Sequence, residues 1–90
     1  SHLNSADTLM TQGKLDGADK HWVHELYHNK FFFELSEGKL SELEIRCSKK
    51  IRRFPIDDID QSWEIPKKWG QCSIFVSGQT VSQFKLYEQR

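Results

Sequence analysis

Short segments in which apolar and polar side chains alternate fill most of the sequence after residue 30. In the clearest of them, Leu43, Ile45 and Cys47 alternate with Glu44 and Arg46. Successive side chains of a β-strand point to opposite faces, so this pattern predicts strands that bury one face. Such strands, joined by tight turns, predict an antiparallel sheet. Five strands are expected, at residues 31–35, 42–47, 49–56, 71–78 and 80–89.

Between these segments lie residues that favour turns. The tetrad 36–39 supplies one turn and residues 77–79 supply another. Residues 57–70, which contain three Asp, one Pro and one Gly, are predicted to form a loop.

A different pattern precedes the strands. Trp22 and Leu26 are four residues apart, as are Val23 and Tyr27, which places them on one side of a helix. Asp19 is a suitable N-cap or first-turn residue. Residues 18–29 are therefore predicted to be helical. The expected fold class is α+β, with one N-terminal helix packed on a mainly antiparallel sheet of about five strands.

The length of 90 residues corresponds to one domain. The α+β domain is expected to span residues 18–90, and residues 1–17 are expected to be a tag remnant followed by an arm or a short helix. Ser1 and His2 resemble what tag cleavage leaves behind, and no Met starts the chain. We therefore expect a piece excised from a longer protein.

Residues 24–28 match the zinc motif H-E-x-x-H, in which one helical turn offers two imidazoles and a carboxylate. On the predicted helix, however, His24 and His28 fall opposite Trp22 and Leu26, which must face the sheet. The histidine side then faces water. Zinc needs a third ligand, and nothing in the sequence brings Glu42, Glu44 or Glu64 back to the helix. We therefore predict no metal site, no cofactor and no enzyme. The alternative is a small zinc metallohydrolase with His24 and His28 as ligands and Glu25 as the base.

The two cysteines, Cys47 and Cys72, both lie on the inward phase of their predicted strands. Cysteines on one face of nearby strands can meet the geometry of a disulfide. We therefore predict a Cys47–Cys72 bridge and, with it, an oxidising compartment. The alternative is a pair of buried thiols in a cytoplasmic protein.

The charges balance, with 13 Lys and Arg against 13 Asp and Glu, for a formal net charge of +0. This balance gives no reason to expect nucleic acid or an anionic membrane as a partner. The dense basic run at 49–53 is predicted to be a solvated strand face, because Asp57, Asp58 and Asp60 follow it closely. We expect no nucleic acid to bind this domain.

Hydrophobic side chains are expected on both faces of the sheet. Phe32, Phe75 and Tyr87 fall on the phase opposite to the core, and Trp63 and Trp69 lie in the predicted loop. One helix covers only one face, and an uncovered aromatic patch usually marks a partner or ligand surface. These five residues are therefore the candidate binding residues. The alternatives are that the N-terminal segment covers the second face, or that an exposed strand edge accepts another strand.

The stretches "HWVHELYHNKFFFEL", "LEIRC" and "IPKKWGQCSIFVSG" give a layout of a helix followed by a sheet, with a cysteine pair. In this layout, which covers most of the chain, the sequence resembles the periplasmic domains of ToxR-type membrane-anchored transcription regulators, particularly the VtrA-like members. The resemblance implies that a DNA-binding domain and a membrane anchor lie outside this piece.

The resemblance further implies a periplasmic location and a cognate periplasmic protein that completes the sheet in a hetero-oligomer. In the VtrA-like case it also implies an apolar ligand such as a bile salt. The expected function is thus a non-enzymatic extracytoplasmic sensor and partner-binding domain of a membrane-anchored transcription regulator. An envelope adaptor domain of the TonB C-terminal kind is an alternative function, and the cytoplasm is the alternative location.

Overall fold

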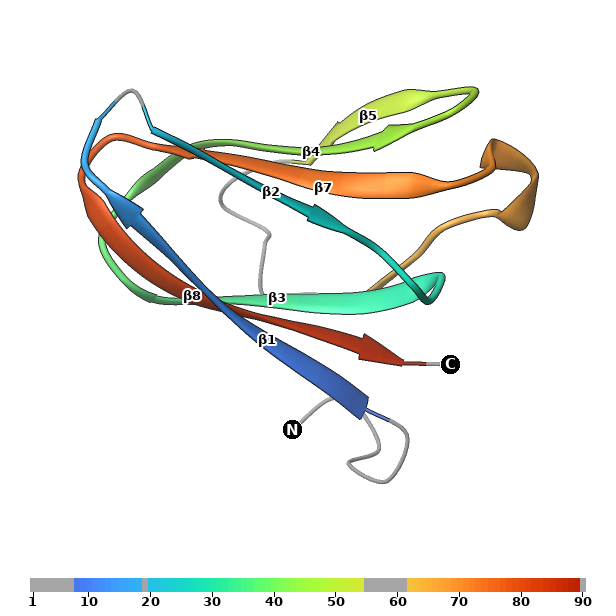
Figure 1. Ribbon diagram of the computed structural model, residues 1–90, viewed down its shortest axis with the longest axis horizontal. Coiled ribbons are helices and arrows are strands. Elements are labelled where there is room, and N and C mark those ends of the chain that lie inside the picture. Colours follow the sequence, from blue (N-terminus) through green and yellow to red (C-terminus); the bar gives the residue numbers. More distant parts are fainter. Residues whose placement is uncertain (1–7, 19, 55–61, 90) are drawn as a thin grey trace.

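The chain folds as two four-stranded antiparallel sheets packed face to face (Figure 1). The computed structural model describes residues 8–18, 20–54 and 62–89. Sheet A has the strand order β1-β8-β3-β6, and sheet B has the order β2-β7-β4-β5. The strands are β1 (Thr8–Asp16), β2 (His21–Glu25), β3 (Lys30–Glu37), β4 (Leu40–Cys47), β5 (Ile51–Phe54), β6 (Ser62–Glu64), β7 (Cys72–Gly78) and β8 (Val81–Gln89). A short 3-10 helix, η3 (Lys67–Trp69), precedes β7.

The predicted α+β fold class is wrong, because the described residues form no α-helix. The expected helix contains β2, which pairs with β7 so that Trp22 lies opposite Val76. A spacing of four residues is even, so Trp22 and Leu26 share a face in a strand as well as in a helix. Val23 and Tyr27 distinguish a helix from a strand, because they would lie beside Trp22 in a helix but lie on the opposite face in a strand. Both side chains are exposed, as the strand requires. Nor does any described segment form a helix long and apolar enough to cross a membrane.

The segment expected to be an arm or a short helix also contains a strand. β1 pairs with β8 along its whole length, from Thr8 opposite Gln89 to Asp16 opposite Val81. It is therefore an integral part of sheet A. Residues 1–7, which include the expected tag remnant, lie outside the described residues.

The five strands predicted from alternation are confirmed as β3, β4, β5, β7 and β8. Of the predicted turn at 36–39, Ser36 and Glu37 belong to β3, and residues 38–39 join β3 to β4. There Gly38 has a φ of 92°, and a Cβ would collide with the carbonyl oxygen of Val81. Of the turn predicted at 77–79, Ser77 and Gly78 belong to β7, and residues 79–80 join β7 to β8. The predicted loop 57–70 contains β6 and η3 in its described part.

The hydrophobic core lies between the two sheets, and each fully buried Phe, Leu, Ile or Val stabilises the fold by about 1.5–3 kcal/mol. In sheet A, the ring of Phe84 occupies the space above Gly13, where any Cβ would collide with it. A glycine in β1 therefore lets this ring pack against the neighbouring strand. Fully buried core residues include Phe31, Phe33, Phe84 and Leu86 of sheet A and Leu43, Ile45, Ile74 and Val76 of sheet B.

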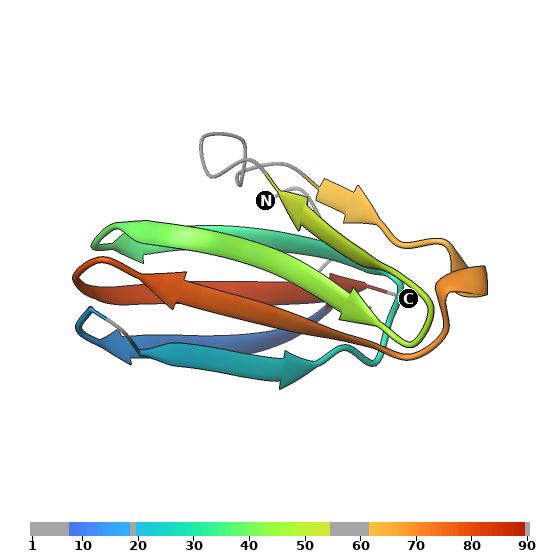
Figure 2. The same cartoon turned by 90° about the horizontal axis from the view of Figure 1, so that it is seen from above.

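Two pairs of edge strands border the sandwich. β1 and β2 run along one side, and β5 and β6 run along the other (Figure 2). The strand ends at the disulfide, the β2–β3 turn, the β4–β5 turn and η3 lie together at the right-hand end of Figure 1. We call this end of the sandwich the disulfide end.

Candidate functional site

The H-E-x-x-H residues do not share a helical turn. His24 lies on the inward phase of β2 with Trp22, Glu25 lies on the opposite face and is exposed, and His28 lies in the β2–β3 turn. The prediction that His24 lies on a solvated face is wrong, because only 23% of its side chain is exposed. Within residues 8–18, 20–54 and 62–89, no three His, Cys, Asp or Glu side chains form a group that could hold a metal ion.

A buried carboxyl group lies beside His24. Glu88 in β8 is fully buried, and its Oε1 accepts hydrogen bonds from the backbone amides of Tyr27 (2.7 Å) and His28 (3.2 Å). Its Oε2 lies 3.5 Å from His24 Nε2. The ring of His24 in turn stacks on Trp22, with centroids 5.4 Å apart. Glu88 thus holds the β2–β3 turn, which connects sheet B to sheet A, against the end of β8.

Sequence reasoning missed Glu88, although the alternation carries a signal for it. Phe84, Leu86 and Glu88 fall on the same phase of β8, so the strand that buries the first two also buries the carboxyl group. A buried ionisable residue requires specific polar partners. Here these partners are chiefly backbone amides, so Glu88 acts as a structural hydrogen-bond acceptor.

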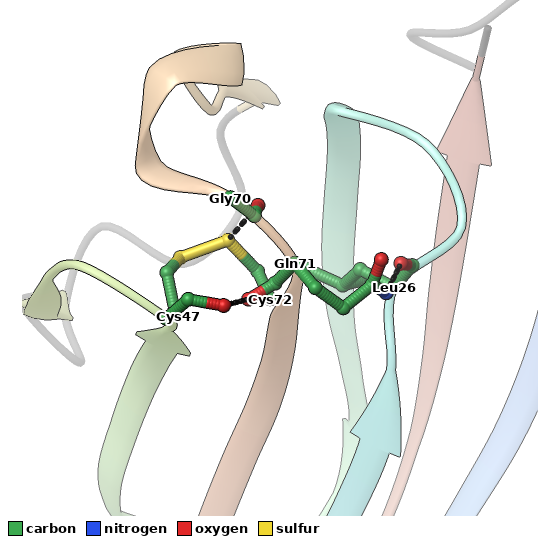
Figure 3. Close-up of a disulfide and its surroundings, with 6 residues drawn as sticks. Leu26, Cys47, Gly70, Gln71 and Cys72 are labelled. Atoms are coloured by element: carbon green, nitrogen blue, oxygen red, sulfur yellow. Dashed lines mark hydrogen bonds between the residues drawn. A yellow bond between two sulfur atoms is a disulfide. The ribbon is translucent and has the colours of Figure 1, made fainter.

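The predicted disulfide between Cys47 and Cys72 is confirmed (Figure 3). The two cysteines are directly opposed in the register of β4 and β7. Next to the bridge, Ser48 N donates to Gln71 O (3.0 Å), and Gln71 Nε2 donates to Leu26 O (3.0 Å). The bridge and these bonds hold the ends of β4 and β7 and the residue after β2 together.

A hollow of about 410 Å³ opens beside the disulfide. It combines buried apolar side chains with a polar rim and is open to solvent. The buried part is Leu26, Ile65 and Cys72, and the rim includes Tyr27, His28, Asn29, Lys67 and Gln71.

The five predicted binding residues do not converge on one surface. Phe32 and Tyr87 lie beside each other on the outer face of sheet A, with ring centroids 6.0 Å apart. Phe75 lies on the outer face of sheet B. Trp63 and Trp69 are partly buried and pack against the core. These residues therefore do not form a single aromatic patch.

The ring of Phe75 is covered by its own neighbours. The guanidinium of Arg46 lies 3.8 Å from the ring centroid, and the ring of His21 lies 4.9 Å away. Arg46 also donates to Oε1 of the buried Glu44 (2.6 Å), and Arg53 donates to Oε2 (3.0 Å). The hydrogen bond from Arg46, supported by that from Arg53, lowers the pKa of Glu44 below its ordinary value. The charges around Phe75 are thus paired within the domain.

The substitution Glu44→Gln is expected to lower stability at pH 7 by about 1 kcal/mol or less, since both arginines are well exposed. The pKa of Glu44 is lowered from 4.5, so its ionic contribution is fully present above pH 4.5. That contribution is lost as the pH falls through the lowered pKa. Urea unfolding at neutral and strongly acidic pH should therefore show a difference between parent and variant only at neutral pH. An equal difference at both pH values would contradict the pairing, and Glu25→Gln serves as the exposed control.

β1 is a long open edge of the sandwich. Along Leu9–Gln12 it pairs with β8 on one side, and no described strand pairs with its other side. Natural proteins guard sheet edges with charges or with very short strands. β5 carries two arginines, β6 has three residues, and β2 has five residues that end on Glu25, whereas residues 8–13 of β1 carry no charge. Among the four described edge strands, β1 therefore has the longest run without a charged side chain, and we call it the unguarded edge.

The side chains of β1 are also incompletely covered. Leu9 and Leu15 lie on the same face of the strand, yet Leu15 is buried and Leu9 is 45% exposed. On the other face, Met10 lies opposite Tyr87 and is 46% exposed. The half of β1 at the disulfide end therefore has an open hydrogen-bonding edge and an exposed apolar side chain on each face.

Comparisons of the chain with protein families, with curated proteins and with solved structures find no match. The fold and its surfaces therefore define the class on their own. The described residues form a small disulfide-linked β-sandwich in which β1 is the unguarded edge strand.

Proposed function

We propose that this domain is a non-enzymatic extracytoplasmic binding module that takes up an extended segment of a partner protein along β1. The observation that carries the proposal is the uncharged edge at Leu9–Gln12, which pairs on one side within the described residues. An added strand would complete the hydrogen bonding of β1 and extend sheet A. Its alternate side chains would cover Leu9 on one face and Met10 on the other.

The location in this proposal follows from the disulfide. Structural disulfides persist in oxidising compartments, such as the periplasm, and are rare in the cytosol. The Cys47–Cys72 bridge therefore supports a periplasmic location, and the expected partner is a cognate periplasmic protein in a hetero-oligomer.

The narrower assignment to a ToxR-type transcription regulator stays a prediction. The layout behind that resemblance begins with a helix, and the segment in question contains β2. A small-molecule ligand such as a bile salt also stays a prediction. We propose the hollow beside the disulfide as its site, because the lining is partly apolar and partly polar.

Linear peptides selected on the protein from a random phage-displayed library test the partner-binding proposal. Selected peptides are expected to bind along β1 in an extended conformation. The double variant Leu9→Lys/Met10→Lys should weaken their binding by about tenfold or more, because lysines on an edge oppose strand addition. Calorimetric titration of one synthetic peptide measures the effect.

The matched control is Val81→Lys. Val81 is 50% exposed, close to the exposed fractions of Leu9 and Met10, but it lies at the opposite end of the sandwich. Peptides that bind the double variant as well as they bind the control would refute binding at β1. Self-association that the double variant abolishes, measured by sedimentation, would replace the partner protein with a second copy of this chain.

A further inference from the structure

Basic side chains gather at the disulfide end, although the net charge of the chain is zero. Lys49 and Lys50 lie in the β4–β5 turn, and Lys67 and Lys68 lie in η3. All four are exposed, and none forms an ion pair within the described residues. We call these four residues the lysine cap.

The lysine cap is held together by the fold. Lys49 N donates to Trp69 O (3.2 Å), and Lys50 Nζ lies 5.3 Å from the centroid of the Trp69 ring. The disulfide lies directly beneath, because Cys47 precedes the β4–β5 turn and Cys72 follows η3. The turn and η3 are accordingly adjacent at the right-hand end of Figure 2. Two segments distant in sequence thus form one fixed basic surface.

Exposed apolar side chains lie at the same end. Ile51 follows the lysine cap at the start of β5 and is 62% exposed. Tyr27 lies in the β2–β3 turn and is 64% exposed. Both residues therefore lie at the disulfide end of the sandwich. Positive charge and apolar groups are therefore presented together.

Few described carboxyl groups oppose these lysines. Glu64 lies opposite Lys30 in the backbone register of β3 and β6, and Glu25 lies at the end of β2; neither forms an ion pair with a lysine of the cap within the described residues. Glu44 is already bound by Arg46 and Arg53, so it does not offset the cap. The aspartates at 57, 58 and 60, which were expected to cancel the basic run, lie outside the described residues.

We propose that the lysine cap binds the surface of an anionic phospholipid bilayer. Each lysine near such a surface strengthens binding by about fivefold. The exposed side chains of Ile51 and Tyr27 suit the boundary between headgroups and acyl chains. The surface therefore combines the two attractions that an anionic membrane offers, and the inference does not depend on strand addition at β1.

Single-stranded nucleic acid fits this surface less well than a membrane. Such ligands stack their bases on open aromatic faces. Here the ring of Trp69 is covered by Lys50, and the guanidinium of Arg52 lies about 5 Å from the rings of Phe54 and Trp63. Stacking would first have to displace these cations.

Sedimentation with vesicles tests the proposal. The protein is expected to bind vesicles of phosphatidylcholine with phosphatidylglycerol but not phosphatidylcholine alone, and salt should weaken the binding. The quadruple variant Lys49→Gln/Lys50→Gln/Lys67→Gln/Lys68→Gln should lose on the order of several-hundredfold in partition. The control is Lys14→Gln/Lys20→Gln/Lys39→Gln/Lys85→Gln, which changes the net charge equally away from the cap and should retain binding.

Three results would overturn the proposal, once thermal unfolding has shown that both variants fold. The first is equal binding to neutral and anionic vesicles. The second is equal partition of the cap variant and the control variant. The third is cap-dependent binding of a single-stranded oligonucleotide without binding to vesicles, which would identify nucleic acid as the ligand.

Discussion

The double variant Cys47→Ala/Cys72→Ala is expected to unfold with a free energy about 3 kcal/mol lower than that of the parent protein. The bridge closes a loop with a sequence separation of 25, and opening it restores conformational freedom to the unfolded chain. In the folded state β4 and β7 remain paired by their ladder, so the fold itself should survive. For a domain of this size the loss corresponds to a fall in Tm of roughly 15 °C.

Thermal and urea unfolding measure this effect, and reduction supplies the control. Dithiothreitol should destabilise the parent protein by about the same amount as the double substitution, and it should leave the variant unchanged. If the variant and the parent unfold together, the bridge contributes no stability and the basis for an oxidising compartment is weakened.

The substitution Glu88→Ala is expected to cost about 3 kcal/mol of stability, because it removes the acceptor for two backbone amides and leaves a cavity between the sheets. The amides of Tyr27 and His28 both donate to Oε1 of this fully buried side chain. Urea unfolding measures the loss. Amide exchange should also show that the β2–β3 turn opens before the rest of the protein.

The matched control for Glu88→Ala is Glu88→Gln. The glutamine keeps an oxygen for the two turn amides and can direct its NH₂ group toward His24 Nε2. It should therefore cost about 1 kcal/mol or less. A glutamine variant as unstable as the alanine variant would show that the charge of Glu88, rather than its role as an acceptor, stabilises the turn.

The part of the fold that sequence predicted correctly is the part in which alternation is continuous. Leu43, Ile45 and Cys47, and likewise Cys72, Ile74 and Val76, point inward as expected. The same phase relation correctly placed the two cysteines within reach of each other. Local periodicity suffices there because each of these strands has one buried and one less buried face.

The prediction at β2 was wrong because the spacing of its apolar residues fits the period of a helix as well as that of a strand. Trp22 and Leu26 are compatible with both a helix and a strand, and pairing with β7 selects the strand. β1 had even less local signal, since Leu9 and Met10 are exposed on opposite faces. Both are edge strands, and each forms because it pairs with a strand that is distant in sequence. A short stretch of sequence contains no information about that pairing.

The sequence predicted the type of candidate site but not its position. An open strand edge was among the expected binding surfaces, but β1 was not expected to be a strand. The aromatic residues chosen instead are divided between two sheets or packed against the core. The lysine cap escaped notice because Lys49 and Lys67 are distant in sequence, and the β4–β5 turn brings them together.

Backbone amide exchange along β1 tests the central claim most directly. NMR would follow the protein with and without a peptide selected on it. Strand addition predicts that amides within Leu9–Gln12 become protected when the peptide binds. It also predicts that the amides of β5, an edge strand of sheet B on the other side of the sandwich, do not change. Protection at β5 or at any other surface, with Leu9–Gln12 unchanged, would contradict the account.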